Sequence, residues 1–415
     1  MSPISQIVAR NRNSELVGIA SWCTAHPETL RAILHAHRES SDAILIEATC
    51  NQVNQHGGYT GMTPPGFRRF IETLARECGI DAARIILGGD HLGPNPWRAL
   101  PAAAAMAEAK ILVREYAEAG FSKLHLDASM ACADDGVLAE TQMAERAAEL
   151  CAVAEASCGA AKPCYVIGTE VPIPGGETET LDGLAVTTAD AAENTFALHR
   201  EAFARCGVSH AFDRVIGIVV QPGVDFGNSQ IFAYNRQRAA RLSQSIAGLP
   251  GVVFEAHSTD YQTAGGLRDL VESHFAILKV GPELTFAFRE AIIAMAGIED
   301  WLNVALPSRI LETIDEVLDH DPSHWRSYAA DGVDRDMIRV FGLSDRIRYY
   351  WPDPRLVAAV AELRNNIDRA IVPPGLVSQF AGQLQFSGGG SLSEHIIQSR
   401  VGAVVAKYRS ACGLS

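Results

Sequence analysis

The sequence lacks paired cysteines, long apolar runs and an excess of basic residues. Its nine cysteines are spaced singly, without a CxxC pair, so neither a disulfide framework nor a zinc ribbon is expected. No apolar stretch reaches the ~18 residues that a membrane-spanning helix needs. The first 20 residues carry Arg10, Arg12 and Glu15 and lack the apolar segment of a secretory signal. We therefore expect a cytoplasmic protein that does not contact a membrane.

Features of nucleotide and nucleic-acid binding are also missing. The chain has 35 basic and 49 acidic residues, a formal net charge of −14, which argues against a nucleic-acid partner. The segment after the first predicted strand, residues 21–26, contains neither GxGxxG nor GxxxxGK[ST]. Because phosphoryl transfer from ATP needs a phosphate cradle, kinase activity is not expected. A small phosphorylated ligand needs only a few local donors and stays compatible with this charge.

A repeating alternation of short apolar runs and Ala-rich helical segments fills the first 291 residues. Strands that alternate with helices pair in parallel through right-handed crossovers. Eight such units predict an α/β fold, a (β/α)8 TIM barrel, in preference to a doubly wound open sheet. The predicted strands are Val17–Ala20, Ala43–Glu47, Ile85–Gly89, Lys123–Asp127, Cys164–Gly168, Val215–Val220, Val252–Ala256 and Ala276–Val280.

The alternation ends near residue 292, and residues 292–415 read as a mostly helical C-terminal region. Helical segments are expected within 292–321, 334–348, 355–370 and 391–410. The segment 349–354 carries two prolines, which cannot lie inside a continuing helix. We expect this appendage to pack on the barrel or to serve in assembly.

Polar residues at the carboxyl ends of the strands predict the functional site, because active sites of such barrels lie at that face. His91, Glu170 and His257 follow three different strands and could share one divalent cation, with zinc as the preferred ion. Asp90 would stand beside this metal as general acid or base. His125, inside the fourth strand, is interpreted as a structural or supporting residue.

Two further segments have alternative interpretations. The polar loop after the second strand carries Asn51 and Gln55, which could contact sugar hydroxyls, although an ordinary surface loop is also compatible. Arg346 and Arg348 could bind a phosphate from the appendage or pair at a domain interface. The adjacent aromatic residues 349–351 favour the interface.

Four segments resemble the Z-subunit family of the class II D-tagatose-1,6-bisphosphate aldolases (GatZ/KbaZ-like), whose members are also labelled tagatose-6-phosphate kinases. They are Glu47–Gln55, Gly88–Asn95, Lys123–Asp127 and Ser344–Pro352. The resemblance spans both the barrel and the appendage. It implies a sugar phosphate substrate of the tagatose type and a class II aldolase catalytic subunit as a partner. The oligomeric state stays open.

The resemblance to class II aldolases also implies residue roles. Asp90 corresponds to the acid, and His91 and His257 correspond to metal ligands. Asp127 and Glu170 match positions near an alternative metal site, and the loop Gly175–Glu179 matches the catalytic loop. We therefore assign catalysis to Asp90, Glu177 and Glu179, metal binding to His91, Glu170, His257 and Gln221, and substrate contacts to Asn51, Gln55, Asp127, Ser258, Thr259 and Gly281.

The sequence departs from the aldolase pattern at two places. Gln221 stands where class II aldolases have a second histidine ligand, and glutamine is a weak neutral ligand. Asp260 and Glu283 lie in the loops that hold phosphate in the aldolases and would repel it there. Two functions therefore stay open: a metal-dependent aldolase or C4-epimerase acting on a ketose phosphate, and a non-catalytic accessory subunit that stabilises a class II aldolase.

Overall fold

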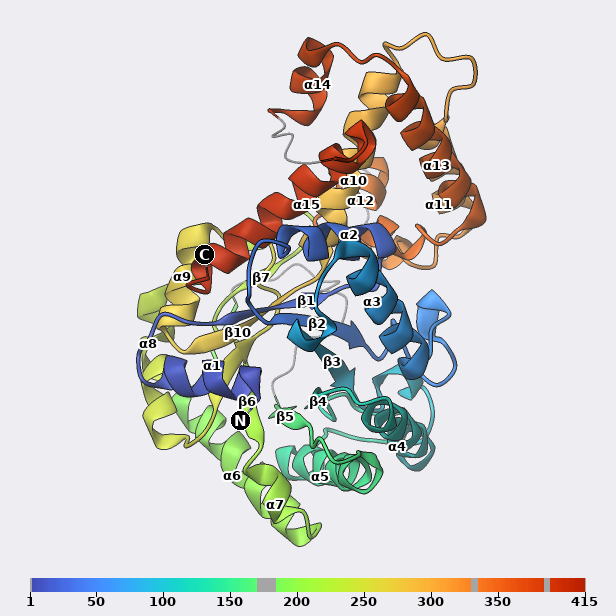
Figure 1. Ribbon diagram of the computed structural model, residues 1–415. Coiled ribbons are helices and arrows are strands. Elements are labelled where there is room, and N and C mark those ends of the chain that lie inside the picture. Colours follow the sequence, from blue (N-terminus) through green and yellow to red (C-terminus); the bar gives the residue numbers. More distant parts are fainter. Residues whose placement is uncertain (1, 170–183, 330–334, 384–388, 415) are drawn as a thin grey trace.

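Eight parallel strands close into a barrel in the computed structural model, which describes residues 2–169, 184–329, 335–383 and 389–414 (Figure 1). Around the barrel, β1 pairs with both β2 and β10, which closes the sheet. This confirms the predicted TIM barrel and each of its predicted strands, with small shifts at the strand ends. The strands are β1 (Ile19–Cys23), β2 (Ile44–Thr49), β3 (Ile85–Leu92), β4 (Lys123–Leu126), β5 (Cys164–Ile167), β6 (Val215–Val220), β9 (Val253–Ala256) and β10 (Phe275–Val280).

Helices follow the strands and form the outer layer of the barrel. Their apolar sides are rich in Ala and Leu, which favour helix and pack closely on the sheet. A short antiparallel hairpin, β7 (Asp225–Phe226) with β8 (Ile231–Phe232), lies between β6 and the next helix. The outer helices are α2 (Pro27–Ala36), α3 (Pro64–Cys78), α4 (Ala102–Glu118), α5 (Glu140–Ser157), α6 (Ala189–Arg205), α7 (Ser209–Phe212), α8 (Arg236–Ser245) and α9 (Ala264–Glu272).

The inside of the barrel is layered, because every second residue of a strand points inward. The layer at the amino ends of the strands is apolar and includes Ile19, Leu45 and Ile277. Helix α1 (Pro3–Arg12) covers this end with Ile4 and Val8. Two residues further along the strands the inward positions are charged: Glu47, Lys123, Glu255 and Lys279. The next layer opens into the site.

The C-terminal region is helical, as predicted. Helix α10 (Pro282–Glu299) leaves the barrel after β10 and runs through residue 291, so the expected domain boundary lies inside one helix. The region continues with α11 (Ile310–His320), α12 (Arg335–Phe341), α13 (Pro354–Arg369), α14 (Pro374–Ala381) and α15 (Leu392–Ala411). Among the described residues, none of the helices is long and apolar enough to cross a bilayer.

The last helix completes the outer layer of the barrel. Helix α15 packs against α9, α2 and β1, at the place where the eighth helix of such a barrel would lie, while α10 packs on its outer side (Figure 1). The Tyr408 hydroxyl donates to the Thr259 carbonyl at 2.8 Å, and its ring meets the edge of Trp22. The Gly18 amide donates to the Cys412 carbonyl at 3.1 Å. The C-terminal region is therefore an integral part of the barrel wall.

Candidate active site

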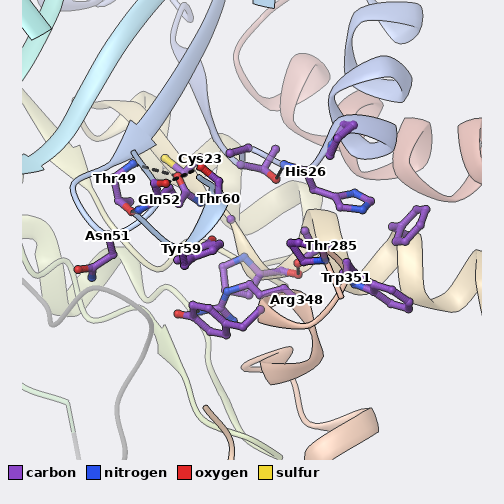
Figure 2. A pocket seen from close by; sticks show the side chains of 18 of the residues that line it. Cys23, His26, Thr49, Asn51, Gln52, Tyr59, Thr60, Thr285, Arg348 and Trp351 are labelled. Carbon is purple, nitrogen blue, oxygen red and sulfur yellow. Dashed lines mark hydrogen bonds between the residues drawn. The ribbon is translucent and has the colours of Figure 1, made fainter. Parts of the chain in front are cut away.

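A cavity of about 500 Å³ opens at the carboxyl ends of the barrel strands (Figure 2). Its floor is made by strand ends, and its sides by the loop after β2 and by the C-terminal region, which meet where Tyr59 contacts Tyr349. Floor residues include Asp90, His91, His257 and Lys279. Asn51, Gln52 and Tyr59 come from the loop, and Arg348, Tyr349 and Trp351 come from the C-terminal region. The appendage thus supplies one wall of the cavity.

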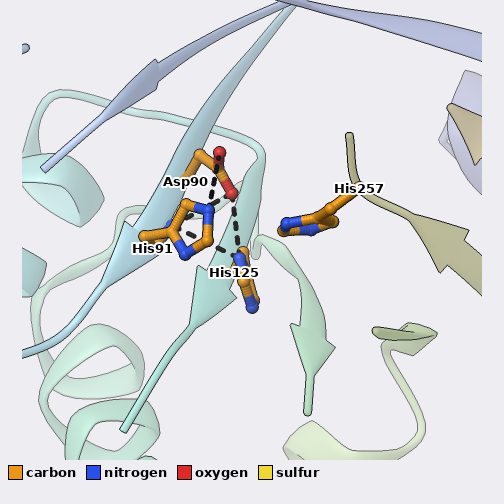
Figure 3. A group of neighbouring side chains, drawn as sticks. All are labelled: Asp90, His91, His125 and His257. Carbon is orange, nitrogen blue, oxygen red and sulfur yellow. Dashed lines mark hydrogen bonds and ion pairs between the residues drawn. The ribbon is translucent and has the colours of Figure 1, made fainter. Parts of the chain in front are cut away.

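Three imidazoles and one carboxylate converge at the floor of this cavity (Figure 3): Asp90, His91 and His257 line it, and His125 lies buried behind them. Asp90 and His91 lie near the carboxyl end of β3, His125 lies on β4, and His257 follows β9. One ligand atom from each residue lies within 4.8 Å of the others, and all four residues are buried. Strands far apart in the sequence bring these groups together, because the carboxyl ends of parallel strands meet at one face.

Each of the three imidazoles also contacts a carboxylate through one of its ring nitrogens. His91 Nδ1 lies 2.8 Å from Asp127 Oδ2, and His125 Nδ1 lies 2.9 Å from Asp90 Oδ1. His257 Nε2 lies 3.0 Å from Glu255 Oε1. Such a carboxylate fixes the ring and its tautomer, so that the other nitrogen presents a lone pair, as is usual for metal-ligating histidines. His125 Nε2 is buried and has no hydrogen-bond partner among the described residues.

A local backbone irregularity brings both Asp90 and His91 to the cavity. Neighbouring residues of a regular strand point to opposite sides. His91 instead has a φ of 50°, in the left-handed region that non-glycine residues seldom adopt, and the pairing of β3 with β4 shifts register here. Ser258, next to His257, has a φ of 52°. Strained backbone of this kind is concentrated at functional sites.

The charged layer below the imidazoles supports the site electrostatically. Lys123 Nζ lies 2.6 Å from Glu47 and 2.8 Å from Glu255, and all three side chains are fully buried. Lys279 pairs with Glu47 and lies 2.7 Å from Asp90 Oδ1. Burial alone would raise the pKa of Asp90, but the nearby His91 and Lys279 outweigh burial and hold this pKa well below its usual range. Asp90 is therefore ionised at neutral pH.

Six of the predicted site residues line the cavity: Asn51, Asp90, His91, His257, Ser258 and Gly281. Four others point elsewhere. Gln55 donates to Glu108 of α4, and Thr259 donates to the Lys279 carbonyl. Asp127 orients His91 and does not line the cavity. Gln221 Oε1 accepts from the Gly223 and Val224 amides of its own loop, which directs it away from the cluster. The predicted residues Glu170, Glu177 and Glu179 lie outside the described residues.

Several residues at or beside the cavity are not predicted from the sequence. His125, interpreted from the sequence as structural, belongs to the imidazole cluster. Lys279 is absent from the predicted site, although a charged residue inside a predicted buried strand is a usable signal. Arg346 and Arg348, which the sequence left with two possible roles, have different environments in the structure. Arg346 donates to the His324 carbonyl and stacks on Tyr328, whereas Arg348 lines the cavity.

Asp260 lies at the cavity wall and gives a testable pH dependence. Burial, followed by the nearby Glu283, raises its pKa to about 7. Between the ordinary pKa and this value, the folded protein keeps a proton that the unfolded chain has lost, so the free energy of unfolding falls as pH rises. An asparagine at this position cannot titrate, so the Asp260→Asn variant lacks this fall. We therefore expect the free energy of unfolding of Asp260→Asn, relative to that of the unsubstituted chain, to be roughly 2–3 kcal/mol higher at pH 8 than at pH 5.

Urea unfolding at both pH values measures this difference. Asp213→Asn, which changes an exposed carboxylate, is the matched control and should show no such gain. Equal stability differences at the two pH values would contradict an elevated pKa for Asp260.

Comparisons with known proteins agree over nearly the whole chain. The family model described as D-tagatose-1,6-bisphosphate aldolase subunit GatZ/KbaZ-like matches residues 4–413. Proteins named D-tagatose-1,6-bisphosphate aldolase subunit GatZ, from Klebsiella pneumoniae and Salmonella typhimurium, are 47% identical over 419 residues and cover 99% of both chains. The crystal structure of a probable tagatose 6 phosphate kinase from Sinorhizobium meliloti is 45% identical, with a TM-score of 0.86 over 95% of this chain and 100% of that one.

Proposed function

Since this chain belongs to the GatZ/KbaZ-like family of D-tagatose-1,6-bisphosphate aldolase subunits, we propose that it acts in the metabolism of phosphorylated ketoses of the tagatose type, at a divalent metal site. The observation that carries the proposal is the convergence of the three carboxylate-supported imidazoles in the cavity. The family resemblance predicted from the sequence is confirmed over residues 4–413.

The donor set fits zinc. Imidazole nitrogens with a carboxylate oxygen are ligands that zinc accepts in a tetrahedral arrangement. His91, His125 and His257 would hold the ion, with Asp90 beside them. The buried Nε2 of His125, which has no partner among the described residues, supports this assignment, because leaving such an atom unpaired costs free energy unless a ligand uses it. When bound, zinc supplies positive charge that stabilises the negative charge developing on the ketone half of the sugar.

The side chains of the cavity would do the remaining chemistry. Asp90 is ionised and can take the proton from the C4 hydroxyl when the C3–C4 bond breaks. It can return this proton when the bond forms again. Asp127 and Glu255 hold the rings of His91 and His257 in place. Cleavage of the bond between C3 and C4 turns C4 into an aldehyde and leaves an electron pair on C3, and it gives aldolase chemistry when C3 then takes a proton from water. Epimerisation at C4 needs no proton at C3, because C3 adds again to the other face of the same aldehyde and Asp90 returns the proton to the C4 oxygen.

The name kinase, which the Sinorhizobium meliloti protein carries, implies different chemistry. Transfer of a phosphoryl group from ATP needs a phosphate cradle and positioned magnesium ligands. The sequence contains no P-loop motif, and the described cavity presents imidazoles at its floor. We therefore propose carbon–carbon bond chemistry for this cavity and not phosphoryl transfer.

The word subunit in the names of the relatives supports a partner chain. We propose a class II aldolase catalytic chain as this partner. Co-expression of the two chains, followed by size-exclusion chromatography, tests the association, and separate elution at micromolar concentration would contradict it. A purely accessory role for this chain would leave the imidazole cluster without a use.

Metal removal tests the proposed site. The purified chain is expected to hold one zinc ion, measured by elemental analysis, and to convert tagatose 6-phosphate or tagatose 1,6-bisphosphate. Treatment with a chelator should reduce turnover at least about 100-fold, because the charge that stabilises the developing anion is lost. Addition of zinc should restore it. A chain that binds no divalent metal and converts neither sugar phosphate would overturn the proposal.

A further inference from the structure

The cavity wall formed by the loops after β9 and β10 carries a carboxylate that the chemistry above does not use. Asp260 lies three residues after His257, lines the cavity and is only 2% exposed. At the start of α10, Asp260 Oδ1 accepts from the Gly281 amide at 3.0 Å and from the Glu283 amide at 2.8 Å. These two contacts hold the carboxylate in place between the loops.

A barrel of this type often binds phosphate at this place. The loops after its seventh and eighth strands, together with the N-terminus of a helix, present backbone N–H groups to the anion. In this chain the seventh and eighth strands of the barrel are β9 and β10. The amides of Gly281 and Glu283 donate to Asp260, so a phosphate at this wall would meet a carboxylate in place of donors.

The charges around Asp260 are also unfavourable for a phosphate. Among the described residues, no basic side chain forms an ion pair with Asp260, and Lys407 of α15 is already paired with Glu283. Burial, followed by the nearby Glu283, raises the pKa of Asp260 to about 7. Above this pH Asp260 is ionised and would repel a phosphate ester, whose second pKa is about 6 and which is then largely a dianion.

The second oxygen of this carboxylate is left for a ligand. Asp260 Oδ2 takes part in no hydrogen bond within the described part of the chain. An ionised carboxylate can only accept hydrogen bonds, so it pairs well with a hydroxyl, whereas a dianionic phosphate has no hydrogen to donate. The wall therefore favours a hydroxyl over a phosphate.

This wall lies within reach of a sugar at the imidazole cluster. Consecutive Cα atoms are about 3.8 Å apart, so the Cα atoms of His257 and Asp260 lie at most about 11 Å apart. Both residues line the same cavity, and Gly281, which bonds to Asp260, follows Lys279 of the floor by two residues. A six-carbon ketose whose C3–C4 bond lies at the imidazoles can therefore extend one of its ends to this wall.

We propose that Asp260 selects ketoses whose end at this wall carries a free hydroxyl, and that it excludes a phosphate from this end. The inference rests on the proposed function and names the substrate class of the same site: ketose monophosphates, in preference to ketose bisphosphates. A single phosphate at the other end of the sugar is compatible with this wall. A second phosphate would be placed against the carboxylate.

Calorimetry on the full chain at pH 8 tests this inference, with tagatose 1-phosphate, tagatose 6-phosphate and tagatose 1,6-bisphosphate as ligands. The two monophosphates cover both orientations of the sugar. We expect the bisphosphate to bind at least about 10-fold more weakly than the tighter monophosphate, because like charges in contact repel. Asp260→Asn keeps an oxygen for the two amides but removes the charge, and should narrow this ratio to less than about threefold. Asp213→Asn, which changes an exposed carboxylate that does not line the cavity, is the matched control and should leave the ratio unchanged.

The outcomes separate the inference from the proposed function. If the unsubstituted chain binds the bisphosphate at least as tightly as both monophosphates, the inference is wrong while the proposed function stands. An unchanged ratio in Asp260→Asn also overturns the role of Asp260. If the unsubstituted chain binds none of the three sugars, the proposed function fails and the inference fails with it. Thermal unfolding shows whether Asp260→Asn is folded, and if it is not, Asp260→Ser, which also removes the charge, decides by the same ratio.

Discussion

Replacing His91 with alanine is expected to abolish stoichiometric metal binding and to lower kcat/KM for a ketose phosphate at least about 1000-fold. The side chain is one of three imidazoles in the cluster, and its loss removes a ligand together with the ring that Asp127 orients. Losing an orienting partner alone typically costs 10- to 100-fold in metal affinity, so losing the ligand itself costs more. Elemental analysis and steady-state kinetics measure the two effects.

Two further variants make this test specific. Asp127→Asn keeps His91 but removes its charged partner, and an intermediate loss of metal affinity is expected. His56→Ala removes an exposed histidine that pairs with Glu108 on the surface and should retain full metal content. If His91→Ala still binds one zinc per chain with unchanged affinity, the imidazole cluster is not the metal site.

Replacing Lys123 with methionine is expected to lower the free energy of unfolding by about 3–5 kcal/mol. Lys123 is fully buried between Glu47 and Glu255, and methionine fills a similar volume without charge. The substitution leaves two buried carboxylates with Lys279 as the remaining cation of this layer among the described residues. Removing one partner of a buried ion pair is costly, because the other charge stays desolvated.

Urea unfolding measures this loss, and Lys110→Met is the matched control. Lys110 pairs with Glu149 between α4 and α5, and both side chains are well exposed to solvent. An exposed pair of this kind contributes about 0–1 kcal/mol. Equal effects of the two lysine substitutions would show that the inner charged layer does not stabilise the barrel.

The fold is predictable because its signals are local and repeated. Each buried strand is a short apolar run between Ala-rich helical segments. Only a few chain topologies are compatible with such an alternation of strands and helices. The C-terminal helices are also predictable from their periodicity. The place of α15 in the barrel wall is not, because the contact of Tyr408 with Thr259 joins residues 149 positions apart, and nothing in either segment signals the other.

The candidate site is predictable only in part. Asp90, His91 and His257 follow strand ends, where polar residues are conspicuous in the sequence. His125 and Lys279 lie within strands, and which strand positions face inward depends on register, which apolar runs alone do not fix. Gln221 and Thr259 stand at strand ends as predicted, but their side chains bond to nearby backbone. The position of a residue in the sequence therefore predicts that it lies at the carboxyl-end face of the barrel. Whether its side chain points into the cavity is known only from the structure.

The contact of α15 with the first strand has a consequence for folding. The Gly18 amide, just before β1, donates to the Cys412 carbonyl, just after α15. The wall of the barrel beside β1 is therefore completed by two segments that are far apart in the sequence. Contacts between residues so far apart in the sequence form slowly, because closing the long loop between them costs conformational entropy before the contacts contribute any stability. The apolar surface beside β1 is covered only after α15 has been synthesised and has docked. A chain in which α15 has not yet docked therefore exposes a hydrophobic surface beside the first strand.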